Sequence, residues 1–257
     1  MAQEIFKRYE KKYLLSQEQY QALVQGISKN MQIDAYGEHT ISNIYFDTLD
    51  YRMIRESIEK PIYKEKLRLR AYGAVRSDSR VFVELKKKFD GIVYKRRVEL
   101  SFDEAKKYLY DGKYPSKDSQ ILREIDYTLC RNQLKPAAYI AYDRVAWCGK
   151  KTECREEMSC KEKIKYGKET EELRITFDRN IRCRETMLDL RSGHCGVFLL
   201  KPGEVLMEMK IPGSVPLWMS RLLTEYEIYP VSFSKYGTFY KEYLLQIYMD
   251  RGGRNCA

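Results

Sequence analysis

The stretch from Tyr63 to Leu100 constrains the fold more than any other, because charged and apolar residues alternate through three consecutive runs. Side chains on a β-strand point to opposite faces with a period of two, so this alternation predicts strands with one polar and one apolar face. Asp90-Gly91 separates the last two runs and is typical of a two-residue hairpin turn. The polar face gathers Lys64, Lys66, Arg68 and Arg70, then Phe82, Glu84, Lys86 and Lys88, then Lys95, Arg97 and Glu99.

A sheet face with so many cations needs either water or a compensating anion, because like charges directly opposite one another on neighbouring strands are destabilising. A solvated face is the simpler interpretation of a single charged strand. Three consecutive strands with the same pattern instead favour a barrel turned inside out, with a charged lumen and an apolar exterior covered by helices. Phosphate is the anion that fits best, since forked Arg and compact Lys together match its oxygens.

Length and charge narrow the classes of protein that the chain can represent. With 257 residues and 44% hydrophobic content, we expect one large folded domain over residues 1–257. The net charge of +10 predicts attraction to a polyanion such as nucleic acid, an anionic membrane or polyphosphate. Seven cysteines without paired spacing favour a reducing compartment, and no signal peptide or membrane-spanning run is evident. We therefore expect a cytoplasmic protein.

The remaining periodicity predicts a mixture of strands and helices, hence an α+β fold. Residues 148–172 are charged and lack periodicity, so they form either a loop or an inserted hairpin. Further strands are expected at 5–15, 40–47, 137–147, 173–181 and 205–211, with Asn43, Tyr45 and Asp47 on one face of the second. Helices are expected at 16–29, 49–59, 101–112, 118–133, 216–229 and 235–249, the first and third beginning with the capping boxes Ser16/Gln19 and Ser101/Glu104.

Alternation in the other strands extends the polar inner face. Cations greatly outnumber carboxylates on it, and Glu10, Glu84 and Glu208 lie on three separate strands. A barrel would bring such carboxylates together as ligands of a divalent ion that bridges phosphates. The residues that alternation adds to this face are Arg8, Glu10, Lys12, Arg144, Arg174, Glu208 and Lys210.

Nine short motifs in order resemble the VTC domain, the polyphosphate polymerase domain within the triphosphate tunnel metalloenzymes, in its bacterial form. They cover nearly the whole chain. The motifs are RYEKKY (8–13), SNIYFDT (42–48), YKEKLRLRAYG (63–73), VFVELKKK (81–88), YKRRVEL (94–100), AYDRVAW (141–147), LRITFDRNI (173–181), LMEMK (206–210) and FSKYGTFY (233–240).

The resemblance implies an eight-stranded antiparallel tunnel in which the γ-phosphoryl group of ATP is transferred to a growing polyphosphate chain. It implies Mn²⁺ or Mg²⁺ as cofactor, bound mainly by Glu208, with Glu10 and Glu84 as further ligands. The residues that would act on the transferred group are Lys12, Arg68, Arg70, Lys86, Lys95, Arg144 and Arg174. Substrate binding would fall to Arg8, Arg55, Lys66, Arg97, Tyr142, Lys210, Ser234 and Lys235.

Two departures from the family pattern stand out. The tunnel hydrolases carry Glu-x-Glu-x-Lys in the first strand, whereas this chain has Arg8-x-Glu10-x-Lys12. The lost carboxylate favours transfer over hydrolysis, because water activation depends on a second metal ion. In the yeast-like domain the last turn carries a lysine where this chain has Ser232.

Several alternatives stay open. A tunnel-fold triphosphatase or nucleotidyl cyclase is possible, although the excess of cations argues against both. A protein that binds polyphosphate or another polyanion without turnover would keep the same cations. A nucleic-acid-binding module is disfavoured, because the strand aromatics mostly share the apolar face. A membrane-protein partner encoded separately is compatible with the sequence, and the oligomeric state is open.

Overall fold

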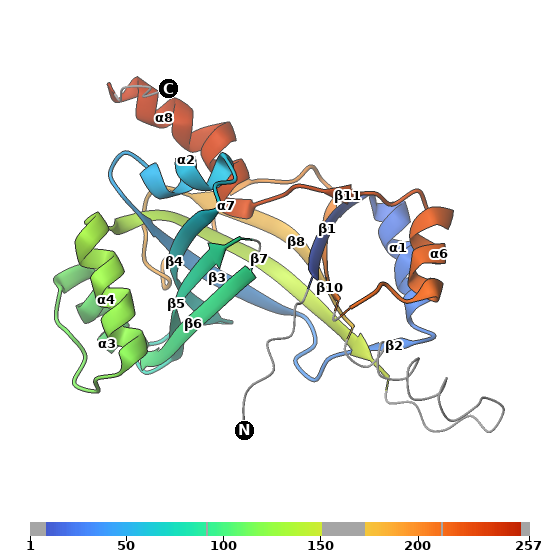
Figure 1. Ribbon diagram of the computed structural model, residues 1–257, viewed down its shortest axis with the longest axis horizontal. Helices are drawn as coiled ribbons and strands as arrows, with labels where there is room; N and C mark the ends of the chain where they lie inside the picture. Colours follow the sequence, from blue (N-terminus) through green and yellow to red (C-terminus); the bar gives the residue numbers. More distant parts are fainter. Residues whose placement is uncertain (1–8, 91, 151–172, 212, 253–257) are drawn as a thin grey trace. The chain divides into compact units, whose positions relative to one another are not determined.

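The computed structural model describes residues 9–90, 92–150, 173–211 and 213–252 (Figure 1). These residues belong to two compact units, each built from three stretches of the chain. Unit 1 takes residues 1–39, 143–179 and 200–233, and unit 2 takes 40–142, 180–199 and 234–257. The prediction that the whole chain is one domain stays a prediction.

Unit 1 packs two helices on the apolar face of an antiparallel sheet. The buried core joins Leu23, Ile27 and Met219 of the helices to residues such as Phe177 and Met207 of the strands. Figure 1 shows α1 beside α6. The elements are β1 (Tyr9–Leu15), α1 (Gln17–Ile27), β2 (Met31–Ile33), β10 (Val205–Ile211), α6 (Leu217–Glu225), β11 (Pro230–Val231) and the parts of β7 (Lys135–Gly149) and β8 (Arg174–Arg184) that lie in this unit.

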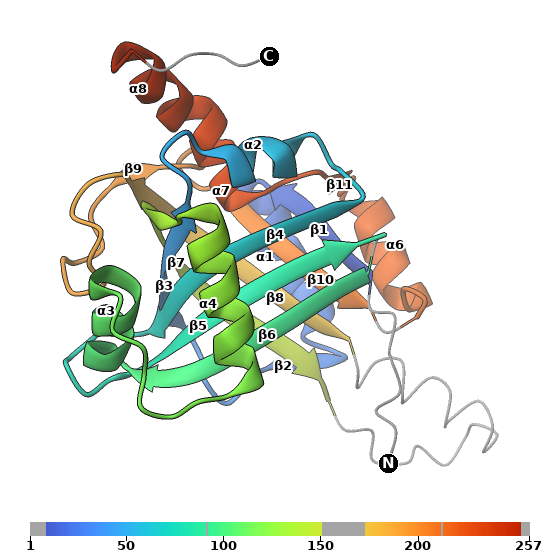
Figure 2. The same cartoon turned by 60° about the vertical axis from the view of Figure 1, so that its left-hand side comes forward.

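Unit 2 is built around the three central strands, and α4 crosses the face of β5 and β6 (Figure 2). The core contains Leu67, Leu69 and Leu85 from the sheet and Phe102 and Ile125 from the helices. The unit consists of β3 (His39–Asp47), α2 (Arg52–Ile58), β4 (Tyr63–Tyr72), β5 (Arg80–Phe89), β6 (Ile92–Ser101), α3 (Phe102–Asp111), α4 (Gln120–Asn132), β9 (Val197–Phe198), α7 (Lys235–Phe239), the π-helix η1 (Tyr240–Leu244), α8 (Leu245–Asp250) and the remainder of β7 and β8.

The local signals in the sequence are confirmed at several element ends. Ser16 and Ser101 each accept a hydrogen bond from the third helical backbone N–H, and the side chains of Gln19 and Glu104 reach back, so both capping boxes form. Gly112 ends α3 in the left-handed region at φ 70°, where glycine avoids a Cβ clash. The hairpin of β5 and β6 pairs Phe89 with Ile92.

The register of unit 2 confirms which residues share a face. Arg68 lies opposite Glu84, and Glu84 lies opposite Arg97. Their sequence neighbours Leu67, Leu69 and Leu85 point the other way and are fully buried. Fully burying a leucine stabilises the fold by about 1.5–3 kcal/mol, whereas a like-charge pair across strands costs about 0.2–1 kcal/mol. The apolar face therefore holds the sheet together despite the cations on the other face.

The closed eight-stranded barrel expected from the resemblance is not what the strand pairing shows. The described residues contain eleven strands in the hydrogen-bonded order β11-β1-β10-β8-β7-β3-β4-β5-β6, with β2 on β7 and β9 on β8, and this order has two ends. The antiparallel α+β class is confirmed. The three unpredicted strands have only two or three residues each, too few for a period of two to be recognised.

Two other boundaries differ from the prediction. β7 extends to Gly149, so it includes Cys148, and residues 151–172 of the unassigned 148–172 segment lie outside the described residues. In the last segment, α7 passes through one turn of π-helix before α8 begins. Across the described ranges, no helix combines the length and the apolar character needed to cross a membrane.

Candidate functional site

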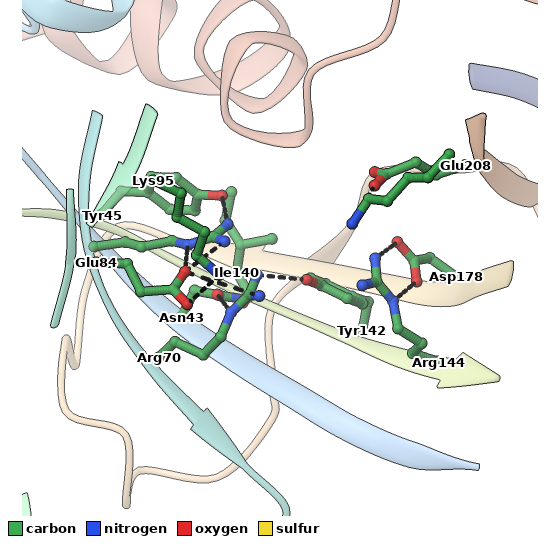
Figure 3. A network of polar contacts seen from close by, with 12 residues as sticks. Asn43, Tyr45, Arg70, Glu84, Lys95, Ile140, Tyr142, Arg144, Asp178 and Glu208 are labelled. Atoms are coloured by element: carbon green, nitrogen blue, oxygen red, sulfur yellow. Dashed lines mark hydrogen bonds and ion pairs between the residues drawn. The ribbon is translucent and has the colours of Figure 1, made fainter. Parts of the chain in front are cut away.

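Unit 2 carries a basic sheet face in which one carboxylate is surrounded by cations (Figure 3). Glu84 Oε2 accepts from Arg68 Nε at 2.8 Å, and Glu84 Oε1 lies 2.6 Å from Lys95 Nζ. Arg70 Nη1 is 3.9 Å from the same carboxylate. Only 1% of Glu84 is exposed. We call Arg68, Arg70, Glu84 and Lys95 the Glu84 cluster.

The charges of the Glu84 cluster stabilise one another. Burial alone would raise the pKa of Glu84, but the attraction of Arg68, Arg70 and Lys95 outweighs it and holds that pKa at about 2. The pKa of Lys95 is lowered. Burial and the charges of Arg68 and Arg70 lower it more than the attraction of Glu84 raises it. One carboxylate thus faces three cations, which leaves a net positive charge for a further anion.

Beside this cluster, three lysines lie opposite one another across three strands. Lys66 of β4 pairs with Lys86 of β5, and Lys86 pairs with Lys95 of β6. We call Lys66, Lys86 and Lys95 the lysine row. On the same face Lys64 pairs with Lys88, and the pKa of Lys64 is lowered by burial and by the charges of Lys88, Lys60 and Lys86. Such repulsion predicts that an anion would stabilise this face.

Polar groups that carry no formal charge fix the orientation of the two arginines. Arg70 Nε donates to Asn43 Oδ1 at 2.8 Å, and its Nη2 donates to the Tyr142 hydroxyl at 3.0 Å. Asn43 is held in turn, because its amide donates to the Ile140 carbonyl at 3.0 Å. Arg68 Nη1 donates to the Tyr45 hydroxyl at 3.2 Å. Both guanidinium groups are therefore held in defined orientations.

The other unit 2 residues predicted for substrate binding lie on the sheet and on α2 and α7. Lys66 Nζ donates to Ser234 Oγ at 3.3 Å, and Lys235 Nζ lies 4.4 Å from the centre of the Tyr142 ring. Arg97 stacks over Phe82. Arg55 of α2 forms an ion pair with Asp50, so its guanidinium has a carboxylate partner.

Unit 1 has a second polar face, on which Arg144 and Asp178 form a bidentate ion pair. Arg144 Nε donates to Asp178 Oδ1 at 2.6 Å and its Nη2 donates to Oδ2 at 2.7 Å. Asp178 is fully buried. Such a bidentate pair holds the planar guanidinium in one orientation. Arg174, which is more exposed, pairs with Asp34 at 3.0 Å.

Carboxylates and lysines alternate across β1 and β10 in unit 1. The register sets Glu10 opposite Lys210 and Lys12 opposite Glu208. Within each strand the ion pairs are loose, with 3.5 Å between Lys12 Nζ and Glu10 Oε1 and 3.5 Å between Lys210 Nζ and Glu208 Oε1. Lys12 Nζ also donates to the Phe233 carbonyl at 3.0 Å. Arg8 lies outside the described residues.

The predicted metal ligands do not form one cluster. Over the ranges that the structure describes, no group of three or more His, Cys, Asp or Glu side chains is placed to hold a metal ion. Glu10 and Glu208 fit an ion that is bound by one or two carboxylates and otherwise by phosphate oxygens, as Mg²⁺ often is. Glu84 fits less well, because two cations already lie within 3 Å of its oxygens. Its assignment as a metal ligand stays a prediction.

The residues that contact the predicted cations but were not predicted as site residues include Asn43, Tyr45 and Asp178, the partners of Arg70, Arg68 and Arg144. The alternation in β3 and β8 already placed them on the polar face. Their importance is visible only in the register, which sets Asn43 opposite Arg70 and Tyr45 opposite Arg68.

These contacts define a class of protein before any comparison is made. It is an α+β protein in which each unit packs helices on the apolar face of an antiparallel sheet and carries oriented cations on the polar face. A model of the VTC domain family matches residues 7–171 and 165–243. The chain belongs to the VTC domain family, as the motifs had indicated.

Comparisons with individual proteins add structural neighbours of low identity. A protein proposed as an adenylate cyclase from Bacillus halodurans is 17% identical, with 88% of this chain and 92% of that chain covered and a TM-score of 0.49. A protein proposed as an adenylyl cyclase from Hippeastrum, with a dominant triphosphatase activity, is 15% identical over 90% and 94% of the two chains, with a TM-score of 0.46. No curated protein matches the chain.

Proposed function

We propose that the protein is an ATP-dependent polyphosphate polymerase that acts on its basic sheet face, as the VTC domain family implies. The observation that carries the proposal is the basic face of unit 2. There the lysine row repels itself across three strands, while the Glu84 cluster holds two arginines in fixed orientations. A linear chain of phosphates supplies negative charge at short, regular intervals and would relieve that repulsion.

The residues of unit 2 would bind and orient the triphosphate. Arg68 and Arg70 are held by neutral and acidic neighbours. Their remaining N–H groups can therefore donate hydrogen bonds to phosphate oxygens without a large loss of side-chain entropy. Lys66, Lys86 and Lys95 would neutralise charge along the chain. Positioning and charge neutralisation are most of what phosphoryl transfer requires of a protein.

The transfer step needs no general base. An oxygen at the end of the polyphosphate chain attacks the γ-phosphorus of ATP, the bond from the γ-phosphorus to the β,γ-bridging oxygen breaks, and ADP leaves with that oxygen. Because the attacking oxygen is already anionic, no proton has to be removed. This agrees with a face on which cations predominate and no histidine is among the predicted site residues.

Mn²⁺ or Mg²⁺ is the proposed cofactor, and Glu208 with Glu10 would contribute its protein ligands in unit 1. Such an ion would supply positive charge that lowers the repulsion between the phosphate groups. The loose pairs of Glu208 with Lys210 and of Glu10 with Lys12 leave both carboxylates able to exchange partners. Arg144, Arg174, Lys12 and Lys210 are proposed to contact phosphate from the same unit.

The test is to incubate the purified protein with ATP and Mn²⁺ and to separate ADP, polyphosphate and orthophosphate. Polyphosphate that rises together with ADP supports the polymerase. Orthophosphate with no polymer would instead identify a triphosphatase, and no turnover despite tight triphosphate binding would identify a polyanion-binding protein. Glu208→Gln should abolish turnover, whereas the exposed Glu225→Gln on α6 should not.

A further inference from the structure

We propose that Asp47 is a positioning residue that holds α2 and α7 against β3 and thereby places the substrate-binding residues that the two helices carry. The inference rests on the proposed function, since it concerns how the same basic face is assembled. Asp47 ends β3 and is 1% exposed, yet it belongs to no ion pair among those found in the described residues. A buried carboxylate of this kind requires a structural explanation.

Hydrogen bonds account for both oxygens of Asp47. Its Oδ1 accepts from the backbone N–H groups of Thr48 at 2.8 Å and Met53 at 2.9 Å. Its Oδ2 accepts from the backbone N–H of Ile54 at 3.1 Å and from the Tyr236 hydroxyl at 2.9 Å. Three elements, β3, α2 and α7, therefore meet at one carboxylate.

Helix α2 depends on this carboxylate because it lacks a cap of its own. Its N-cap residue, Tyr51, has a left-handed backbone at φ 57° and forms no side-chain capping bond. The first N–H groups of a helix need acceptors. Asp47 accepts from Met53 and Ile54, and the Thr48 hydroxyl accepts from Arg52 at 2.8 Å. Arg55, one of the residues predicted to bind phosphate, lies one residue after Ile54 on this helix.

Helix α7 is joined to the Glu84 cluster through the same contact. The ring of Tyr236 stacks on that of Tyr45 with 4.9 Å between the ring centres, and the Tyr45 hydroxyl accepts from Arg68. Tyr236 directly follows Ser234 and Lys235, whose side chains contact Lys66 and the Tyr142 ring. A shift of Tyr236 would thus displace Tyr45, which contacts Arg68, and also Ser234 and Lys235, which precede Tyr236 in the chain.

Burial raises the pKa of Asp47, while the hydrogen bonds from Tyr236 and the backbone lower it and only partly compensate. The carboxylate is therefore kept at an energetic cost that a simple packing residue would not bear. The cost of burying this group agrees with a role in positioning, which the geometry already indicates.

The experiment compares Tyr236→Phe with Tyr108→Phe. Each change removes one hydroxyl that donates to a carboxylate in unit 2, from Tyr236 to Asp47 at 2.9 Å or from Tyr108 to Asp126 at 3.4 Å. Tripolyphosphate binding is measured by calorimetry, and folding is checked by circular dichroism. We expect Tyr236→Phe to weaken binding about tenfold, because residues in one hydrogen-bond network are energetically coupled. Tyr108→Phe should leave the affinity unchanged.

A double-mutant cycle separates positioning from a general loss of stability. Asp47→Asn keeps one acceptor oxygen for α2 but loses the acceptor for Tyr236, and it should bind tripolyphosphate as weakly as Tyr236→Phe does. Combined with Lys235→Ala, Tyr236→Phe should cause less than the sum of the two separate losses. Strictly additive losses, or equal losses in Tyr236→Phe and Tyr108→Phe, would overturn the inference. A wild-type protein that binds no tripolyphosphate would instead overturn the proposed function.

Discussion

Lys95 Nζ lies 2.6 Å from Glu84 Oε1, while Arg68 holds the other oxygen of the same carboxylate, so one buried acid organises cations from two strands. Glu84→Gln keeps the shape but removes the charge. We expect it to destabilise the fold by about 3–5 kcal/mol, because breaking a buried ion pair leaves uncompensated charge. Urea unfolding measures the loss. Glu99→Gln, whose pair with Arg80 is exposed, should cost about 0–1 kcal/mol. Equal losses would contradict this account.

The stability of the protein should fall in acid through Glu84. Its pKa is about 2 in the fold against 4.5 ordinarily, and a lowered folded pKa contributes stability that is complete above the ordinary value. That contribution, on the order of 3 kcal/mol, is lost as the pH falls from about 4.5 to about 2. Unfolding measured at successive pH values should show the difference between wild type and Glu84→Gln shrinking over this range. A constant difference would show that Glu84 is not ionised in the fold.

Replacing Arg68 or Arg70 by Ala should weaken ATP binding about tenfold to a hundredfold, since charged hydrogen bonds are worth roughly 1.5–3 kcal/mol. Arg96→Ala is the matched control. Arg96 pairs with Glu124 at 3.8 Å and points to the opposite face of β6. Calorimetric titration gives the affinities. Unchanged affinity in both cluster variants, or the same loss in Arg96→Ala, would exclude the Glu84 cluster as the triphosphate site.

Lys86 should show a trade-off between stability and binding. Lys86→Met removes the central charge of the lysine row, so the free protein should gain about 0.2–1 kcal/mol from lost repulsion. A ligand stabilises the folded protein more the more tightly it binds, so the gain in melting temperature on adding polyphosphate should be smaller than in wild type. Thermal unfolding with and without polyphosphate tests both effects. A variant that is stabilised by polyphosphate as strongly as wild type would show that the lysine row does not bind it.

How far the sequence predicts the site depends on the connections between strands. Only two residues separate β5 from β6 in the sequence, which limits the register of a hairpin, so the pairing of Lys86 with Lys95 can be predicted. Residues 73–79 join β4 to β5 without a recognisable turn type, so the sequence assigns Arg68 to a face but does not place it opposite Glu84. The contact of Asp47 with Tyr236 spans 189 residues, and no periodicity signals it.

The fold, like the site, can be predicted from the sequence only in part. Period-two alternation identifies the long strands and the face that each residue occupies, and the register confirms both. It cannot show whether the last strand pairs with the first, because strand closure depends on twist and tilt accumulated over the sheet. The closed barrel came from the resemblance alone. The ligand set of Glu10, Glu84 and Glu208 was drawn from three strands without knowledge of their neighbours, and Glu84 proves to have cations around it.

The most direct test of the central claim follows the γ-phosphoryl group itself. The protein is incubated with ATP labelled at the γ-phosphate, a short polyphosphate primer and Mn²⁺, and the products are separated by chain length. The account predicts label in chains longer than the primer, with one ADP formed for each phosphate added. Label that appears only in orthophosphate, with the primer unchanged, would contradict it.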